Sequence, residues 1–236
     1  MSNKGNLFLI PSSISPNTQD AIVPPKVRDS LQAIRYFLAE DIRTARRYLG
    51  SLKLYEKIDA LTFEVLNKDT KEGDLAALFK PAFAGNNLGV LSESGCPGIA
   101  DPGALAVRFA HQNAIKVIPL VGPSAIFLAL MASGLNGQRF AFHGYLPIQR
   151  KEAVRAIRDL ERESKLKNQT QIFIETPYRN NQFLANLVQE LMPETLLCVA
   201  LDITGENESI RTDLVGSWRA QTIELSKNPA VFLFLA

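Results

Sequence analysis

The sequence is poor in the side chains from which disulfide frameworks and metal centres are built. Its 236 residues include only two cysteines, Cys96 and Cys198, and two histidines, His111 and His143. These numbers exclude a disulfide framework and a histidine-rich metal centre, so no metal is predicted. No histidine or lysine next to Cys96 marks its thiol for activation, and we interpret Cys96 as a small residue that fills space in a loop.

Long apolar runs and a large excess of one charge are also absent. No apolar run approaches the length of a membrane span, and the N-terminal residues lack the apolar core and cleavage site of a signal peptide. We therefore expect a cytoplasmic protein with no membrane association. Because the formal net charge is only +2, a surface that binds nucleic acid must be local. The 46% hydrophobic and 21% charged residues are typical of a folded protein with one or two domains.

The densest cluster of turn-forming residues lies in the stretch 88–103, LGVLSESGCPGIADPG. Its first four residues predict a buried parallel strand, and its glycines and prolines predict a loop. Asp101 directly before Pro102 predicts an N-cap with proline at the first helical position. A loop at the carboxyl end of a strand is where α/β sheets bind ligands, although an ordinary tight connection is the alternative. The stretch contains neither a phosphate-loop motif nor the GxGxxG fingerprint.

Strands that alternate with helices predict an α/β domain with a largely parallel sheet over residues 1–119. The expected strands are 6–10, 36–39, 61–66, 88–91 and 116–121, and the expected helices include 25–34, 44–49 and 104–110. Residues 120–236 predict a second, mixed α/β domain. It is expected to have helices at 125–132 and 149–167 and strands at 139–145, 171–174, 196–201, 210–215 and 230–235, with an antiparallel portion late in the chain.

Charged and polar residues near the predicted strand ends are the functional candidates. Glu40 and Asp41 follow a strand, where capping of the next helix is the alternative role. Ser124 precedes a helix whose free N–H groups could hold an acidic ligand group, and Gly134 is the expected left-handed cap at its other end. In the helix 149–167, the basic residues Arg150 and Lys151 are candidates for phosphate contacts, and a solvated helix face is the alternative.

Five motifs in order carry a resemblance over nearly the whole chain. They are AEDIRTARRYL, SESGCPGIADPG, VGPSA, SGLNGQRFAFHGYLP and IETPYR. Together they resemble the tetrapyrrole methylase superfamily of S-adenosylmethionine-dependent methyltransferases. Within it, the chain is most similar to the branch of ribosomal RNA small subunit methyltransferase I, which methylates a cytidine ribose 2′-hydroxyl.

The resemblance implies two α/β domains of the class III methyltransferase type, with the cofactor S-adenosylmethionine in the cleft between them, and usually a homodimer. It implies cofactor contacts at Ser92, Glu93, Ser94, Gly95, Pro97, Ile99, Ala100, Asp101, Pro123, Ser124, Ala125, Glu175, Ile203, Pro229, Ala230 and Val231. The catalytic residues stay open. If the acceptor is a hydroxyl group, the candidate bases are Glu40, Asp41 and Glu93. The candidate substrate contacts are Arg43, Arg150 and Lys151, and the expected partner is ribosomal RNA or the small ribosomal subunit.

The chain departs from the pattern of this branch at three segments. It has PSSIS at 11–15 where the branch has Thr-Pro-Ile-Gly-Asn, and SESGCP at 92–97 where the branch has Ser-Asp-Ala-Gly-Thr-Pro. It has NKDT at 67–70 in place of a segment with histidine and Asn-Glu. The first and third segments fall where substrate is expected. We therefore predict an rRNA ribose methyltransferase, with a methylase of a tetrapyrrole or other small molecule and a non-catalytic RNA-binding protein as alternatives.

Overall fold

The computed structural model describes residues 4–221 and 223–236 and divides the chain into two units. Unit 1 is Met1–Ser124 and unit 2 is Ala125–Ala236. The sequence analysis placed the division at residue 119, whereas the structure keeps residues 120–124 with unit 1. One reason is that the Leu120 N–H donates to the Leu9 carbonyl at 3.0 Å, which extends the pairing of the last strand of unit 1.

Unit 1 contains a five-stranded sheet in which all neighbouring strands are parallel, as the sequence predicts. Its strands are β1 (Leu7–Ile10), β2 (Tyr36–Ala39), β3 (Thr62–Val65), β4 (Leu88–Leu91) and β5 (Val117–Pro119), in the order β3-β2-β4-β1-β5. The central strand β4 pairs with both β1 and β2, and all four of its residues are buried. The carboxyl ends of these three strands therefore lie side by side at one edge of the sheet.

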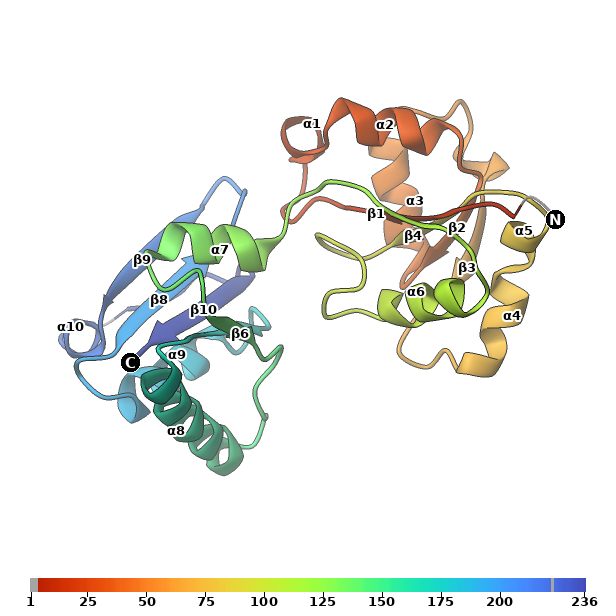
Figure 1. Cartoon of the computed structure of the whole chain (residues 1–236). Helices are drawn as coiled ribbons and strands as arrows, with labels where there is room; N and C mark the ends of the chain where they lie inside the picture. The colour runs from red at the N-terminus through yellow and green to blue at the C-terminus, as the bar shows by residue number, and fades with distance from the viewer. Residues whose placement is uncertain (1–3, 222) are drawn as a thin grey trace. The chain divides into compact units, whose positions relative to one another are not determined.

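Helices cover both faces of this sheet (Figure 1). The helices of unit 1 are α1 (Gln19–Ile22), α2 (Pro25–Gln32), α3 (Ile42–Ser51), α4 (Leu75–Leu78), α5 (Lys80–Phe83) and α6 (Gly103–Gln112), with 3-10 turns at Ile58–Ala60 and Glu72–Asp74. In β2, Phe37 and Ala39 pack in one apolar cluster with α2 and α3, and Leu38 packs in the other cluster with α4 to α6. Burial on both faces explains why the strands are apolar at successive positions.

Unit 2 contains a mixed five-stranded sheet in the order β6-β7-β10-β8-β9. Its strands are β6 (Phe140–Phe142), β7 (Thr170–Glu175), β8 (Leu196–Leu201), β9 (Ser209–Leu214) and β10 (Ala230–Leu235). Only the β6–β7 pair is parallel, because β10 runs antiparallel to β7 and β8, and β9 antiparallel to β8. The antiparallel portion predicted late in the chain is thus confirmed.

The helices of unit 2 are α7 (Ala125–Ser133), α8 (Arg150–Lys167), α9 (Asn180–Glu190) and α10 (Val215–Arg219). The sequence predicts α7 and α8 but neither α9 nor α10. The strand predicted at 210–215 is wrong at Val215, because that residue begins α10. Gly134 follows α7 with a φ of +70°, which confirms the predicted left-handed cap.

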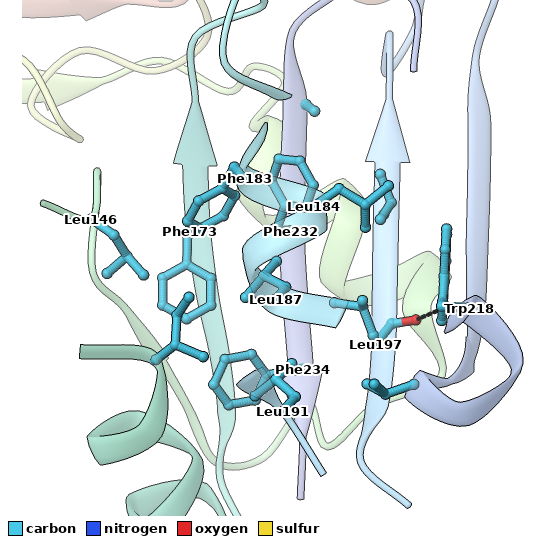
Figure 2. Packing of buried hydrophobic residues seen from close by; sticks show 14 of the residues in the cluster. Leu146, Phe173, Phe183, Leu184, Leu187, Leu191, Leu197, Trp218, Phe232 and Phe234 are labelled. Atoms are coloured by element: carbon cyan, nitrogen blue, oxygen red, sulfur yellow. Dashed lines mark hydrogen bonds between the residues drawn. The ribbon is translucent and has the colours of Figure 1, made fainter. Parts of the chain in front are cut away.

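The core of unit 2 is rich in aromatic side chains (Figure 2). The Phe173 ring lies 5.4 Å from that of Phe234, and the Phe183 ring lies 4.9 Å from that of Phe232, measured between centroids. Trp218 of α10 is buried, and its indole N–H donates to the Leu197 carbonyl at 3.1 Å. These contacts fix the positions of strands β7, β8 and β10, whose ends carry the candidate site residues of unit 2.

A search of the described residues finds no helix with both the length and the apolar character that crossing a membrane requires.

Candidate functional site

The loop after β4 closes around one carboxylate. Asp101 Oδ1 accepts hydrogen bonds from the backbone N–H groups of Gly98 and Gly103, both at 2.7 Å. Gly98 has a φ of +88°, and a Cβ on Gly103 would lie 2.8 Å from Asp101 Oδ1, so both positions need glycine. The prediction that Asp101 is the N-cap of the following helix is wrong, because α6 begins at Gly103 with Pro102 as its N-cap residue. The Asp101 carboxylate still accepts a hydrogen bond from the N–H group of Gly103, the first residue of α6.

Two other segments of unit 1 are bonded to this loop. The Ser12 N–H donates to the Gly95 carbonyl at 2.9 Å, and the Ser12 hydroxyl donates to the Ser92 carbonyl at 3.1 Å. From the other side, the Cys96 thiol donates to the Pro123 carbonyl at 3.2 Å. Burial raises the pKa of the Cys96 thiol, which favours its neutral form and agrees with a packing role. The structure therefore brings the PSSIS segment, the glycine loop and the GP dipeptide of VGPSA together.

Three carboxylates gather at the same edge of the unit 1 sheet. Glu40 directly follows β2, and Glu93 and Asp101 lie in the loop after β4, the neighbouring strand. Burial, together with the negative charges of Glu93 and Asp101, raises the pKa of Glu40, while Lys68 opposes this shift. Burial also raises the pKa of Asp101, against the hydrogen bonds from Gly98 and Gly103. A general base works best with a pKa near the working pH. The raised pKa of Glu40 therefore makes it a better candidate base than Asp41, whose pKa is lowered.

Asp41, the second candidate base, is used as a helix cap. Its Oδ1 accepts a hydrogen bond from the Thr44 N–H at 2.6 Å, and this bonding lowers the pKa of the carboxyl group. The capping alternative of the sequence analysis is therefore observed. Arg43, the candidate substrate contact next to it, is exposed in the first turn of α3.

In unit 2, the predicted site residues gather where three adjacent strands meet one edge of the sheet. Ala230 at the start of β10 pairs with Glu175 at the end of β7 on one side and with Leu201 at the end of β8 on the other. Ile203 lies two residues beyond β8, and the Pro229 carbonyl accepts from the Asp202 N–H at 2.9 Å. Residues far apart in the sequence therefore form one polar edge.

Four buried side-chain atoms of the described residues have no hydrogen-bond partner. They are Asp101 Oδ2, Glu175 Oε2, Asn180 Oδ1 and Thr204 Oγ1. The Arg179 guanidinium lies 3.1 Å from Glu175 Oε2 as an ion pair, without the geometry of a hydrogen bond. Because buried polar atoms are nearly always paired in folded proteins, such atoms mark positions where a ligand can complete the bonding. Each of the four lies in or next to a segment that the sequence analysis assigned to the cofactor.

Asn180 and Thr204 were missed by the sequence analysis. Asn180 is fully buried at the start of α9, and its amide donates to the Asn228 carbonyl at 2.7 Å, next to Pro229. Thr204 follows Ile203 and has a φ of +67°, a conformation that L-residues adopt rarely outside functional sites and tight turns. The available signal was their position, since each is a polar residue shortly after a buried strand.

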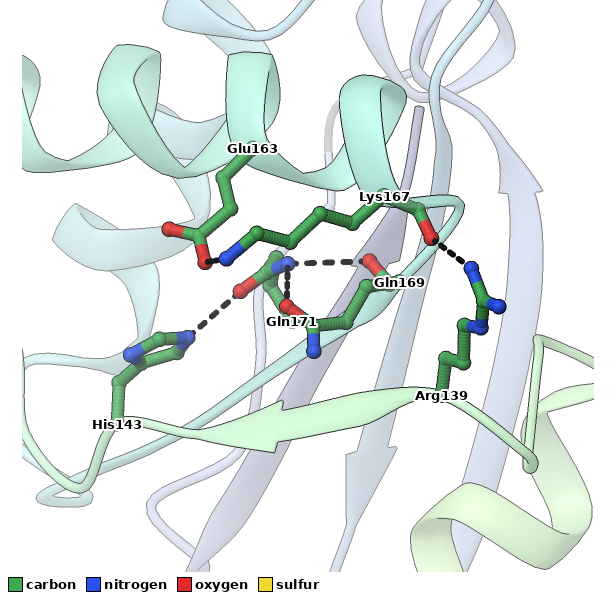
Figure 3. Close-up of polar contacts among 6 residues, drawn as sticks. All are labelled: Arg139, His143, Glu163, Lys167, Gln169 and Gln171. Carbon is green, nitrogen blue, oxygen red and sulfur yellow. Dashed lines mark hydrogen bonds and ion pairs between the residues drawn. The ribbon is translucent and has the colours of Figure 1, made fainter.

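The histidine of unit 2 belongs to a different polar cluster (Figure 3). His143 Nε2 lies 2.6 Å from Gln171 Oε1, and the Gln171 amide donates to the Gln169 carbonyl at 3.1 Å. Gln171 is fully buried, so these bonds satisfy a side chain that would otherwise be costly to bury. The cluster lies at the start of β7, roughly 13 Å along the strand from Glu175, and we assign it a structural role.

The two basic candidates on α8 lie in different surroundings. The Arg150 guanidinium donates to Gln189 Oε1 of α9 at 3.2 Å, whereas Lys151 is exposed and lines a groove with Arg155, Arg158 and Arg162. In residues 4–221 and 223–236, no group of three or more histidine, cysteine or acidic side chains is placed to hold a metal ion.

The fold of this chain is similar to that of solved two-domain methyltransferases. The methyltransferase CobJ has a TM-score of 0.63 at 18% identity, with 98% of this chain and 94% of that chain covered. The uroporphyrin-III-C-methyltransferase from Thermus thermophilus has a TM-score of 0.56 at 17% identity, covering 98% and 92%. At these identities the likeness shows the fold alone. A scan against protein-family models finds no match.

Sequence relatives identify the family. The ribosomal RNA small subunit methyltransferase I of Escherichia coli O157:H7 is 31% identical over 214 residues, which cover 91% of this chain and 71% of that protein. The protein of the same name from Vibrio cholerae serotype O1 is 29% identical over 231 residues, covering 96% and 76%. The chain therefore belongs to the ribosomal RNA small subunit methyltransferase I family. It is a methyltransferase whose methyl donor is S-adenosylmethionine.

Proposed function

We propose that this chain transfers the methyl group of S-adenosylmethionine to a ribose 2′-hydroxyl in small-subunit ribosomal RNA. The RNA acceptor is supported by the relatives, which are named ribosomal RNA small subunit methyltransferase I. The observation that carries the choice of a hydroxyl acceptor is Glu40, a carboxylate with a raised pKa beside the glycine loop. A hydroxyl group must lose its proton as it attacks, so this acceptor needs a base at the edge of the sheet where Glu40 lies.

The four buried atoms without a hydrogen-bond partner fit the chemistry of the methyl donor. S-adenosylmethionine carries an ammonium group, two ribose hydroxyls and an adenine amine, all of which donate hydrogen bonds. The buried carboxylate atom Asp101 Oδ2 suits the ammonium group, and Glu175 Oε2, Asn180 Oδ1 and Thr204 Oγ1 are acceptors for hydroxyl or amine donors. When bound, the donor supplies a methyl carbon made electrophilic by the adjoining sulfonium.

The proposed cofactor contacts extend the set that the resemblance implied. They are Ser92, Glu93, Ser94, Gly95, Pro97, Ile99, Ala100, Asp101, Pro123, Ser124, Ala125, Glu175, Ile203, Pro229, Ala230 and Val231, to which we add Asn180 and Thr204. In this assignment Glu40 accepts the proton of the acceptor hydroxyl on a carboxylate oxygen. Burial, with the negative charges of Glu93 and Asp101, keeps the pKa of Glu40 raised. The remaining residues bind and orient the reactants, which is the main requirement of a direct displacement.

The test combines binding with product analysis. Calorimetric titration with S-adenosylmethionine is followed by transfer of a tritiated methyl group to small ribosomal subunits from cells that lack this protein. A methylated 2′-oxygen cannot attack the adjacent phosphodiester, so label that survives alkaline hydrolysis in a dinucleotide is the expected result. Label in the mononucleotides that alkaline hydrolysis releases would contradict a ribose acceptor. Uroporphyrinogen III is offered in a parallel assay, and label in it with none in RNA would overturn the RNA substrate.

We also propose that the chain acts as a homodimer, as its family resemblance implies. Light scattering on the purified protein at micromolar concentration should then give twice the 26.1 kDa mass of the chain. A monomer mass at a concentration where methyl transfer proceeds would contradict this assembly.

A further inference from the structure

One face of α8 carries a row of cations that the methyl-transfer chemistry does not use. Lys151, Arg155, Arg158 and Arg162 recur at intervals of four, three and four residues, which places them on the same side of the helix, about one turn apart. With Val154 and Asp159 they line a groove. We name the four cations the basic stripe. The opposite side of α8 is anchored in the core through Ala153 and Ile157, so the basic stripe faces outward.

The basic stripe has more positive charge than its neighbours neutralise. Arg158 pairs with the nearly buried Glu190 carboxylate at 2.6 Å, which fixes its guanidinium in place. Arg155 and Arg162 share the single carboxylate of Asp159, at 3.8 and 2.5 Å. Among the described residues, no hydrogen bond or ion pair engages the Lys151 amine. One carboxylate cannot neutralise two guanidiniums, so positive charge remains along the row.

We propose that the basic stripe binds the phosphodiester backbone of the RNA substrate. This inference rests on the proposed function, and it specifies a surface by which the RNA is held. Arginine presents its donors as a planar fork that matches phosphate oxygens, and the side chains of Arg155 and Arg162 are 87% and 79% exposed, so they are accessible. A row with one cation per helical turn, about 5.4 Å apart, suits a ligand that repeats a negative charge along its length.

The contact is expected to give affinity without reading sequence. Phosphate contacts release condensed counterions, so the logarithm of the binding constant falls linearly with the logarithm of the salt concentration. Three available cations are expected to contribute about 2 to 3 units to that slope. Asp159 lies between Arg155 and Arg162 and pairs with both, which would lower the affinity of the basic stripe for isolated anions.

The test compares two variants that lower the formal net charge of +2 equally. The stripe variant carries Lys151→Gln, Arg155→Gln and Arg162→Gln, and it retains Arg158 because Glu190 would otherwise be a buried unpaired charge. The control variant carries Lys57→Gln, Lys80→Gln and Lys116→Gln, three exposed residues of unit 1. Binding to small-subunit ribosomal RNA is measured at several salt concentrations, and S-adenosylmethionine binding is measured by calorimetry.

The stripe variant is expected to bind the RNA about 10- to 100-fold more weakly near physiological salt, with a salt slope about 2 to 3 units smaller, while the control variant changes little. Both variants should bind S-adenosylmethionine like the wild type. Equal behaviour of the two variants toward RNA, with an active wild type, would overturn the basic stripe and leave the proposed function standing. A wild type that binds the cofactor but neither binds nor methylates the RNA would overturn both.

Discussion

The polar edges of the two units differ in what they offer a ligand. In unit 1, carboxylates gather around a glycine loop, and burial together with the negative charges of Glu93 and Asp101 shifts the pKa of Glu40 upward. In unit 2, strand ends hold buried acceptors, two of which, on Asn180 and Thr204, belong to uncharged side chains. The first arrangement is suited to proton transfer and to binding a cation. The second arrangement is suited to selecting a ligand by hydrogen bonds to buried atoms.

The largest expected effect tests whether unit 1 supplies the base. Glu40→Gln should lower kcat for rRNA methylation about 10²- to 10⁴-fold, because the amide cannot accept the hydroxyl proton. S-adenosylmethionine affinity, measured by calorimetry, should change little. Asp41→Asn is the matched control, since asparagine also caps helices well and Asp41 serves as a cap. A loss of turnover in Asp41→Asn with normal turnover in Glu40→Gln would reverse the assignment.

The second effect tests the charge of the glycine loop. Asp101→Asn retains an oxygen that can accept from Gly98 and Gly103 but removes the negative charge proposed for the ammonium group. Loss of one charge-assisted hydrogen bond should weaken S-adenosylmethionine binding about 10- to 100-fold in calorimetry. Thermal unfolding of the unliganded variant is the check on the loop. An unchanged dissociation constant would remove Asp101 from the cofactor contacts.

The third effect tests the uncharged acceptors of unit 2. Thr204→Val keeps the shape of the side chain and removes a buried hydroxyl that has no partner in the unliganded chain. Removing such a hydroxyl should leave the melting temperature unchanged or raise it, while S-adenosylmethionine binding weakens about 3- to 10-fold. A lower melting temperature with unaltered cofactor affinity would show that the hydroxyl serves the fold and not the ligand.

The smallest effect concerns pH. Glu40 acts as a base only when ionised, so kcat should fall as the pH drops through its raised pKa. Glu93→Gln removes one of the negative charges that raise this pKa, and the acidic limb of the kcat profile should therefore move to lower pH. The profile is recorded at saturating S-adenosylmethionine, because Glu93 is itself a proposed cofactor contact. A limb that stays in place would separate Glu40 from the observed ionisation.

The sequence was most informative where local patterns decide the structure. The strand 36–39 and the run 88–91 were predicted with the observed bounds, since short apolar runs between turn signals have few other options. The helix α9 was not predicted; it begins with two asparagines, Asn180 and Asn181, which have low helix propensity. For Asn180 and Thr204 the sequence offers only their position after a buried strand, because burial of a polar atom without a hydrogen-bond partner is a property of the folded chain.

The bonds from Ser12 to the glycine loop have a consequence for binding kinetics and entropy. Ser12 is 3% exposed, lies 80 residues from Ser92 in the chain, and is itself steadied by Tyr48, whose hydroxyl donates to the Pro11 carbonyl at 2.7 Å. A loop held at both flanks before a ligand arrives loses little conformational freedom on binding. Ser12→Gly should therefore slow association and make the binding entropy more unfavourable, even though Ser12 is not among the proposed cofactor contacts. The short segment after β1 therefore keeps the glycine-rich binding loop rigid.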